Sequence, residues 1–227
     1  MGAAQFESDV SFENSESYAA AMLCRTRHGN LHAGLLYRRK YEAKILHLGW
    51  TDDLRDRWAE DDNSREWVRF WAAPQVEPRR LFAISAHCTR IWKKFQQTNS
   101  MPYGLAFYQS KFRETGAFQN ETPAVVGISC STFILAVFNT MGVMLLNEES
   151  WPVRKDDDMK WYESLPQTLK DTAPFLKGEV EAGVRRIRPE EVLGACACKV
   201  PAHFDACRAH GEQLVTVLDQ SKEPAKE

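Results

Sequence analysis

Features that would place the chain in a membrane or secreted class are missing from its sequence. No apolar run reaches the roughly 18–20 residues that a transmembrane helix needs. The longest such run, around residues 133–146, is interrupted by Asn139, Thr140 and Gly142. The N-terminal segment has neither a basic region nor an apolar region of a secretory signal, and Phe6 stands where a myristoylation signal needs Ser or Thr. We therefore expect no integral membrane segment and a cytoplasmic location.

An excess of charge and a disulfide framework are also missing. The chain of 227 residues carries 29 Lys and Arg against 31 Asp and Glu, for a net charge of −2. No block of like charge is longer than the three aspartates at 156–158. This balance gives no electrostatic basis for binding nucleic acid. The six cysteines are unevenly spaced, unlike those of a disulfide-stapled domain, so we expect reduced thiols.

What the sequence does contain is a series of strand patterns followed by helix patterns. Strand patterns recur across residues 18–50 in the runs YAAAMLCRT, LHAGLLYRR and AKILHLGW. The first two flank His28-Gly29-Asn30, so the pattern predicts a three-stranded antiparallel meander. Thr51-Asp52-Asp53 then predicts a helix cap. The apolar spacing predicts helices at 78–97, 130–141, 156–169, 189–198 and 202–220, and short strands at 101–109 and 143–147.

These patterns predict one main domain with additions at both ends. Residues 1–16 are polar and acidic, and we expect a flexible arm. The expected core spans 17–150, and a helical extension over 151–220 packs on it. The last residues, 221–227, are expected to be disordered.

Two histidines lie on neighbouring predicted strands. If the hairpin is centred on Arg39 and Lys40, His32 and His47 are directly opposite each other on one face of the sheet. Their Cβ atoms would then be about 5 Å apart. The turn carries no Gly or Asn that would set the register, so the pairing is inferred from the spacing alone.

A cysteine opens the apolar helix predicted at 130–141. A thiol in the first turn of a helix meets unpaired backbone N–H groups and the positive end of the helix dipole, which favour the thiolate. An imidazole beside it can accept the proton and later return it to a leaving group, and a second polar residue can fix the tautomer of that imidazole. Cys130, His32 and His47 are therefore candidate catalytic residues, and the N–H of Cys130 is a candidate oxyanion donor.

At these residues the chain resembles circularly permuted papain-like thiol enzymes, a group that includes permuted NlpC-type peptidases and lecithin–retinol acyltransferase-like proteins. The resembling stretches are LHAGLLY, ILHLGW and SCSTFILAVF, in that order, within residues 17–145. The resemblance implies Cys130 as nucleophile, His32 as base and His47 as orienting residue. Ser129 stands where the acyltransferase-like members often have Asn, which favours hydrolysis over lipid acyl transfer.

The expected fold is therefore α+β: a papain-like, circularly permuted antiparallel sheet packed on a central helix that carries Cys130, with extra C-terminal helices. The expected function is a cysteine peptidase or amidase that cleaves an amide, isopeptide or related acyl bond, without a cofactor. Its substrate would be a peptide, a peptidoglycan-like molecule or another acyl-bearing molecule. Two alternatives stay open, namely acyl transfer to an amine, alcohol or lipid (acyltransferase or phospholipase-like) by the same residues, and a catalytically silent binding domain.

Further residues are candidates for less central roles. Tyr103 and Ser131 could bind an oxyanion or shape the cleft, although a strand aromatic such as Tyr103 is more often a packing residue. Trp50 is expected in the core, on the opposite face from His47. No metal is expected. The alternative is a zinc site in the C-terminal stretch, which places several ligand-type residues within a short span but lacks the usual C-x₂-C spacing: Cys196, Cys198, His203, Cys207 and His210.

Overall fold

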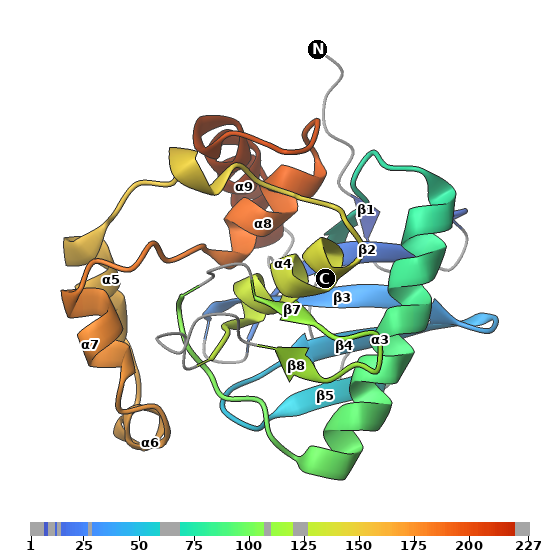
Figure 1. The fold of residues 1–227 in the computed structure, drawn as a ribbon. Coiled ribbons are helices and arrows are strands. Elements are labelled where there is room, and N and C mark those ends of the chain that lie inside the picture. Colours follow the sequence, from blue (N-terminus) through green and yellow to red (C-terminus); the bar gives the residue numbers. More distant parts are fainter. Residues whose placement is uncertain are drawn as a thin grey trace, which may run out of the picture.

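The computed structural model shows an α+β protein with an antiparallel sheet and several helices (Figure 1). The residues that it describes are 7–8, 12, 15–26, 29–59, 69–106, 110–119 and 127–220. His28 and the tail at 221–227 lie outside the described residues. None of the helices in these described ranges is long and apolar enough to span a membrane.

The main sheet has six strands in the order β1-β6-β2-β3-β4-β5, and every neighbouring pair is antiparallel. The predicted three-stranded meander is confirmed as β2, β3 and β4. The strands span Glu7–Ser8 (β1), Ala19–Arg25 (β2), Leu31–Arg39 (β3), Glu42–Leu48 (β4), Leu54–Trp58 (β5) and Arg69–Ala72 (β6). A separate two-stranded sheet pairs Lys111–Phe112 (β7) with Phe118–Gln119 (β8).

The prediction of a helix cap at Thr51-Asp52-Asp53 is wrong, because this segment is a turn into β5. Asp52 has a φ of 55°, a left-handed conformation that ends regular structure, and the chain then returns along β4 with Leu48 paired to Leu54. The carboxylate of Asp52 accepts a hydrogen bond from the N–H of Met101 at 2.5 Å. Aspartate favours turns for the same reason that it favours caps, namely local hydrogen bonding to the backbone, so the pattern did not separate the two.

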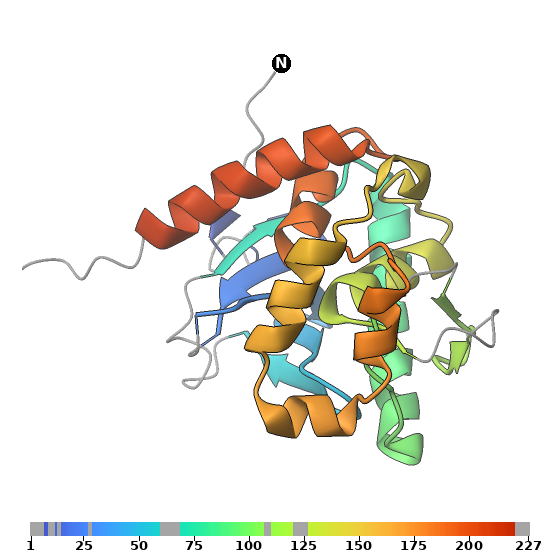
Figure 2. The ribbon, with the colours of Figure 1, turned by 90° about the vertical axis from the view of Figure 1, so that its left-hand side faces the viewer.

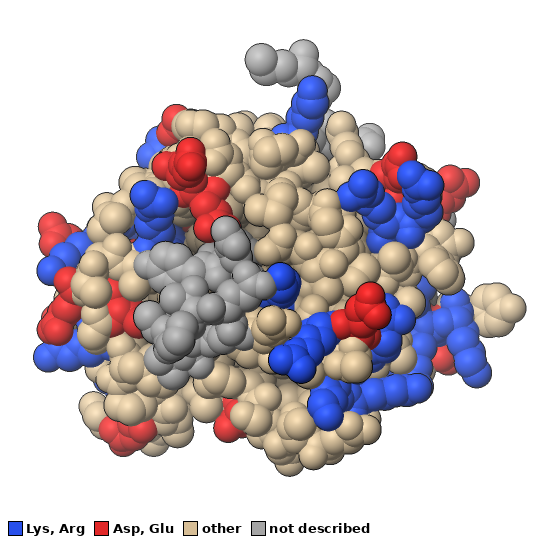
Figure 3. Space-filling view, viewed as in Figure 1, with Lys and Arg blue, Asp and Glu red and all other residues tan. Residues whose placement is uncertain are grey.

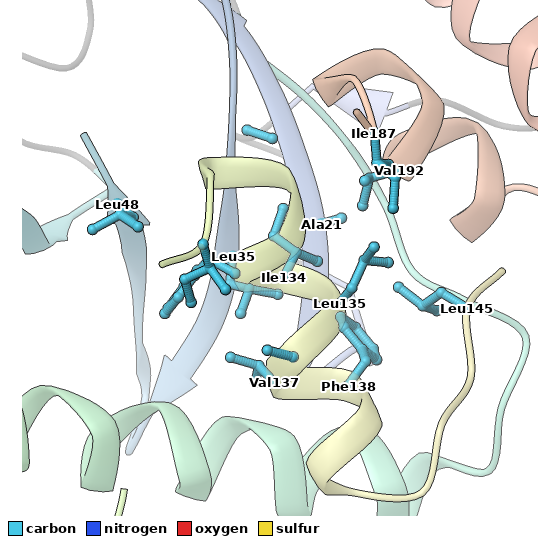
Figure 4. Packing of buried hydrophobic residues seen from close by; sticks show 14 of the residues in the cluster. Ala21, Leu35, Leu48, Ile134, Leu135, Val137, Phe138, Leu145, Ile187 and Val192 are labelled. Atoms are coloured by element: carbon cyan, nitrogen blue, oxygen red, sulfur yellow. The ribbon is translucent and has the colours of Figure 1, made fainter. Parts of the chain in front are cut away.

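Helices cover one face of the sheet. Helices α3 (Pro78–Thr98), α4 (Cys130–Thr140) and α8 (Pro189–Cys196) contact the central strands on this face. The large hydrophobic core lies between them, and Figure 4 shows Ile134, Leu135 and Phe138 of α4 packed among strand and helix side chains. A smaller cluster covers the other face of the sheet and consists of Phe12, Ala20, Met22, Cys24, Leu36, Ala43, Ile45, Ala59 and Trp71.

Helix α4 is held by its cap and by its burial. Ser129 is the N-cap, its side chain accepts the N–H of Thr132, and the Thr132 hydroxyl accepts the N–H of Ser129 in a capping box. The helix is buried almost all round, as a central helix must be. It ends before Gly142, which has a φ of 69°, as the sequence predicts. Burial of each large apolar side chain such as Phe133 stabilises the fold by roughly 1.5–3 kcal/mol.

The C-terminal helices form a second group, and the first three of them lie beyond the N-terminal end of α4, on the left in Figure 1 and toward the viewer in Figure 2. A 3-10 turn at Glu148–Ser150 leads into them. They are α5 (Lys155–Ser164), α6 (Gln167–Thr172), α7 (Leu176–Glu181), α8 and α9 (Phe204–Gln220). The predicted helix at 156–169 is thus two helices, separated at Pro166 because proline has no N–H to continue the first. Helix α7 was not predicted.

Buried ion pairs join α5 to α8. Arg154 pairs with Glu191, which also accepts a hydrogen bond from the indole N–H of Trp151 at 3.1 Å. Arg186 pairs with the buried Asp158 at 3.3 Å. Because breaking one side of a buried pair leaves an unpaired charge in a low dielectric, these contacts fix where α5 stands relative to α8.

Three further expectations need correction. Parts of the segment 1–16 are not a loose arm, since Glu7–Ser8 pair with β6 and Phe12 is fully buried. In the strand predicted at 101–109, the described residues 101–106 form no strand and instead pack across residues 127–128, with the N–H of Ile128 bonded to Pro102 O at 3.0 Å. The strand predicted at 143–147 is reduced to a single bridge at Leu146.

Gly34 gives a test of how tightly β3 meets β4. A Cβ atom at this position would lie 2.9 Å from the Cβ of His47 and 3.3 Å from the carbonyl oxygen of Leu46. We expect Gly34→Ala to lower the free energy of unfolding by about 1–3 kcal/mol, measured by urea denaturation, because such overpacking forces the strands apart. Gly178→Ala is the matched control, since no atom lies within 4 Å of its added Cβ. If the two variants were equally stable, β4 would be able to move away from an added Cβ at residue 34 without loss of stability.

Candidate active site

Cys130 is the first residue of α4, and it lies at the end of the core that faces α5 to α7. Its exposed fraction is only 7%. The capping box occupies the N–H groups of Ser129 and Thr132. The N–H of Cys130 has no helical carbonyl four residues earlier, as is general for the first turn of a helix. A buried thiol therefore sits beside a backbone donor that the helix itself does not use.

His32 and His47 meet through their rings, although the predicted register is wrong by two residues. The observed pairs run from Arg39↔Glu42 to Leu35↔Leu46, around a two-residue turn in which Lys40 has a φ of 61°. Continued by one pair, this register places Gly34 opposite His47. His32 is therefore a diagonal neighbour of His47 instead of its direct partner, and a two-residue shift keeps both rings on the same face.

The diagonal placement brings the two imidazoles into hydrogen-bonding contact. His32 Nε2 lies 2.9 Å from His47 Nδ1, and the ring centroids are 4.9 Å apart at an interplanar angle of 79°. Both side chains are buried, with 8% and 4% exposed. Gly34 makes the contact possible, because its missing side chain leaves the space that the Cβ of His47 approaches.

Cys130 joins this pair through His32. The thiol interacts with the imidazole of His32 by a side-chain hydrogen bond, and it also receives a hydrogen bond from the backbone of Ala33. Since Nε2 of His32 faces His47, the nitrogen left for the thiol is Nδ1. The pairing of β3 with β4 ends at Leu35. The thiol therefore contacts β3 at Ala33, where β3 is no longer paired with β4. The structure thus brings together the three residues that the sequence singled out.

The protonation of His47 follows from its surroundings. Burial lowers the pKa of His47 well below its ordinary value, and the charges of His32, Arg55 and Arg57 lower it further. A neutral imidazole has one acceptor nitrogen and one donor nitrogen. With Nδ1 facing His32, the neutral ring can accept at Nδ1 only if its proton is on Nε2. His32 then donates from Nε2 and keeps Nδ1 for the exchange of a proton with Cys130.

The pKa of the Cys130 thiol is lowered in spite of its burial. Burial is the largest influence on its pKa and raises it. The charge of His32, the hydrogen bonds from His32 and Ala33, and a weaker contact with Ser131 together lower the pKa of Cys130 below its ordinary value. The other cysteines in the described core show the contrast, since burial raises the pKa of Cys88 and of Cys207, the latter to about 12.

The two further candidates, Tyr103 and Ser131, also lie near the thiol. The hydroxyl of Ser131 is 4.0 Å from the sulfur of Cys130. Tyr103 is buried and stacks on Trp50, with ring centroids 3.9 Å apart. Burial raises the pKa of Tyr103, and the negative charge of a Cys130 thiolate raises it further, so the phenol remains a hydrogen-bond donor.

Trp50 does more than fill the core. It follows the end of β4 at Leu48, and its indole N–H donates to Thr172 Oγ1 at 2.8 Å and to Leu169 O at 3.1 Å. The indole is half-buried and connects the wall beside Tyr103 to α6. Trp50 is therefore only partly buried against the core, and its indole N–H also holds α6.

Glu179 of α7 is a site residue that sequence reasoning missed. Its carboxylate accepts the N–H of Leu105 at 2.9 Å, which anchors the segment 101–106. That segment in turn lies against residue 127, because a Cβ on Gly127 would come within 2.2 Å of Pro102 O. No pattern in the sequence around residue 179 predicts this contact, because a glutamate that faces solvent on a helix would stand in the same sequence pattern.

The cysteines and histidines of the zinc alternative are not arranged as a metal site. Cys196, Cys198 and Cys207 lie close together between α8 and α9, and the side chains of Cys198 and Cys207 are hydrogen-bonded. His203 is largely exposed and faces Asp205 at 3.7 Å. Within the described ranges, no group of three or more His, Cys, Asp and Glu residues could hold a metal ion.

The lowered pKa of Cys130 predicts a specific pH profile for its alkylation. Iodoacetamide should modify Cys130 with a midpoint below the ordinary thiol value of about 8.5, measured by mapping each cysteine by mass spectrometry. In His32→Ala the midpoint should move above the ordinary value, because burial then acts without the opposing imidazole. Cys198, the one cysteine of intermediate exposure among those described, is the internal reference. An unchanged midpoint in His32→Ala would remove His32 from the site.

Comparison of the chain with protein-family models, with curated proteins and with solved structures gives no match. The case for a function therefore depends on the geometry of the site alone. That geometry is a thiol at the start of a buried helix, a histidine that contacts it, and a second histidine that holds the first.

Proposed function

We propose that the protein is a cysteine hydrolase that cleaves an amide, isopeptide or related acyl bond through a thioester on Cys130. The observation that carries the proposal is the continuous chain of contacts from Cys130 through His32 to His47, with His32 Nε2 at 2.9 Å from His47 Nδ1. A thiol, a base and a residue that orients the base, in contact in that order, are the parts of a nucleophilic acyl-transfer site.

In the proposed reaction the Cys130 thiolate attacks the carbonyl carbon of the substrate, and the carbonyl oxygen becomes an oxyanion. The N–H of Cys130 donates to that oxygen at the start of α4. His32 gives its proton from Nδ1 to the leaving amine, the C–N bond breaks, and a thioester remains. A water molecule, whose proton passes to His32, then attacks the thioester and releases the acid, which restores the thiolate and the imidazolium.

His47 acts in this scheme as a neutral acceptor. Each time His32 becomes charged, the Nε2 proton of the imidazolium faces an acceptor nitrogen and not a second cation. The low pKa of His47, caused by burial, keeps it in this role through neutral pH. A histidine thus supplies the orienting acceptor that a carboxylate supplies in other triads.

The fold proposed for this site is the circularly permuted papain-like arrangement. Its support is the order of the elements along the chain: the base on β3, the orienting residue on β4, and the nucleophile at the start of the later helix α4. The helix packs on the sheet that carries both histidines.

Acyl-enzyme trapping tests the function. A panel of p-nitrophenyl esters and peptide p-nitroanilides, quenched in acid, should leave an acyl group on Cys130 that intact mass and peptide mapping detect. We expect no acyl group in Cys130→Ala and at least a 10²-fold slower acylation in His32→Ala, the loss typical of a missing general base. Cys198→Ser should acylate normally. Equal acylation of Cys198 and Cys130 in the native chain, or undiminished acylation in His32→Ala, would contradict the proposal.

The orienting role of His47 gives a separate prediction. His47→Leu removes the acceptor without adding charge, and we expect kcat to fall by about 10²-fold, a loss at the lower end of that caused by a missing general base, while KM stays unchanged. His47→Asn offers an amide oxygen in place of Nδ1 and should recover part of the rate. Steady-state kinetics on the best substrate of the panel measures both values. A His47→Asn variant as slow as His47→Leu would show that the ring fills space and does not accept a hydrogen bond.

A further inference from the structure

A pocket of about 410 Å³ opens between the hairpin of β2 and β3, helix α5 and the segment that leads into α8. Its volume is within the range of pockets that hold small molecules. Leu31 lines it and directly precedes His32. Arg186 also lines it, and the charge of Arg186 acts on Tyr103, which is itself within electrostatic reach of Cys130. The pocket therefore reaches β3 at the residue that precedes His32.

Basic side chains outnumber acidic ones in the lining of this pocket, and two of the arginines are paired with acidic residues outside the lining. Four basic side chains and two acidic ones line it: Arg25, Lys160, Arg186, Arg188, Asp157 and Glu190. Acidic and basic side chains are both present on the face of the molecule seen in Figure 3.

The basic side chains of the pocket are not equally engaged. Arg25 is bound through all three of its guanidinium nitrogens, to both carboxylate oxygens of Asp219 and to the carbonyl oxygen of Gly29. One nitrogen of Arg188 contacts Asp157 at 3.3 Å and Asp158 at 3.8 Å. Arg186 likewise contacts Asp158 through one nitrogen, although a guanidinium offers five N–H donors.

Lys160 adds to this excess of donors. It is exposed on α5 at the rim of the pocket, and it forms no ion pair within the described ranges of the chain. The pocket thus presents more N–H donors than acceptors. A ligand that carries several acceptor oxygens on one negatively charged group would accept hydrogen bonds from the remaining donors.

The donors are also held in place before any ligand binds. The guanidinium of Arg186 stacks on the ring of Trp161, with its central carbon 3.9 Å from the ring centroid. Its partner Asp158 is buried and belongs to the ion pairs that join α5 to α8. A fixed guanidinium loses little conformational entropy on binding, which is the usual requirement of a recognition site for a carboxylate or a phosphate.

We propose that this pocket is a substrate subsite that binds an anionic group, a carboxylate or a phosphate, on the molecule whose acyl bond is cleaved at Cys130. Lys160, Arg186 and Arg188 are its ligand-binding side chains. The inference rests on the proposed function for the identity of the substrate's reacting bond, and on the pocket itself for the negative charge.

Alkylating probes of matched shape test the subsite on the full chain. The probes are N-iodoacetyl-β-alanine, its neutral amide and N-iodoacetyl-phosphoethanolamine. In each, the Cys130 sulfur attacks the CH₂ group, the C–S bond forms, and iodide leaves. Rates at Cys130 are mapped by mass spectrometry and divided by the rates with glutathione. We expect at least one anionic probe to exceed the amide by about tenfold, and the two anions distinguish carboxylate from phosphate.

Variants of Lys160, at the rim of the pocket, then test whether the charge of the pocket causes the preference for anionic probes. Lys160→Ala should lower the ratio of anionic to neutral rates at least threefold, and Lys160→Glu should bring it to one or below. Lys160 is exposed, so neither change disturbs the core. Lys93→Ala removes the same charge from an exposed position on α3 and should leave the ratio as it was. A native ratio of one, or a ratio that Lys160→Glu does not change, overturns the subsite.

The outcome also separates the subsite from the proposed function. If Cys130 reacts with the neutral amide far faster than Cys198 does but shows no anionic preference, the hydrolase proposal stands and the subsite is wrong. If Cys130 reacts no faster than Cys198, the hydrolase proposal fails. Calorimetric titration of inorganic phosphate and N-acetyl-β-alanine into the native and Lys160→Glu chains then tests the subsite by itself. Binding to the native chain alone supports the subsite. Equal binding to both chains, or no binding to either, refutes it.

Discussion

A neutral imidazole at position 47 is the condition on which the site depends. The ring is buried, and burial lowers its pKa, so it stays an acceptor toward His32. If His47 were charged, two N–H donors would face each other at 2.9 Å, and His32 would turn away from the thiol. The low dielectric that makes burial of a charge costly is therefore what holds His32 in position. The same low dielectric strengthens the effect by which His32 lowers the pKa of the Cys130 thiol.

The helices that follow the core are part of this arrangement. Glu179 anchors the segment at Leu105, and Trp50 donates hydrogen bonds to α6, so the wall around Tyr103 is fastened from outside. The buried pairs of α5 with α8 hold that outer layer in turn. The surroundings of Cys130 thus depend on residues that lie well beyond it in the chain.

The sequence was sufficient to predict that His32, His47 and Cys130 lie together, but not their exact geometry or the contact made by Glu179. Alternation along a strand has a period of two, so His32 and His47 share a face in the predicted register and in the observed one. The turn at Lys40 sets the register, and no Gly or Asn signals its left-handed conformation. The residues Thr51-Asp53 predict a helix cap as readily as a turn, because the same residue types favour both. Contacts such as that of Glu179 depend on packing between distant segments, which local patterns do not contain.

The close approach at residue 127 has a consequence for how relatives of this protein can be found. Any side chain there would collide with the backbone at Pro102, so a chain that builds its site in this way must keep glycine three residues before Cys130. Gly34, two residues after His32, is also confined, because an added Cβ would lie 2.9 Å from the Cβ of His47. The pair of spacings, H-x-G on a strand and G-x-x-C at a helix start, is a signature imposed by steric exclusion. It should persist in distant homologues after the packing residues have diverged.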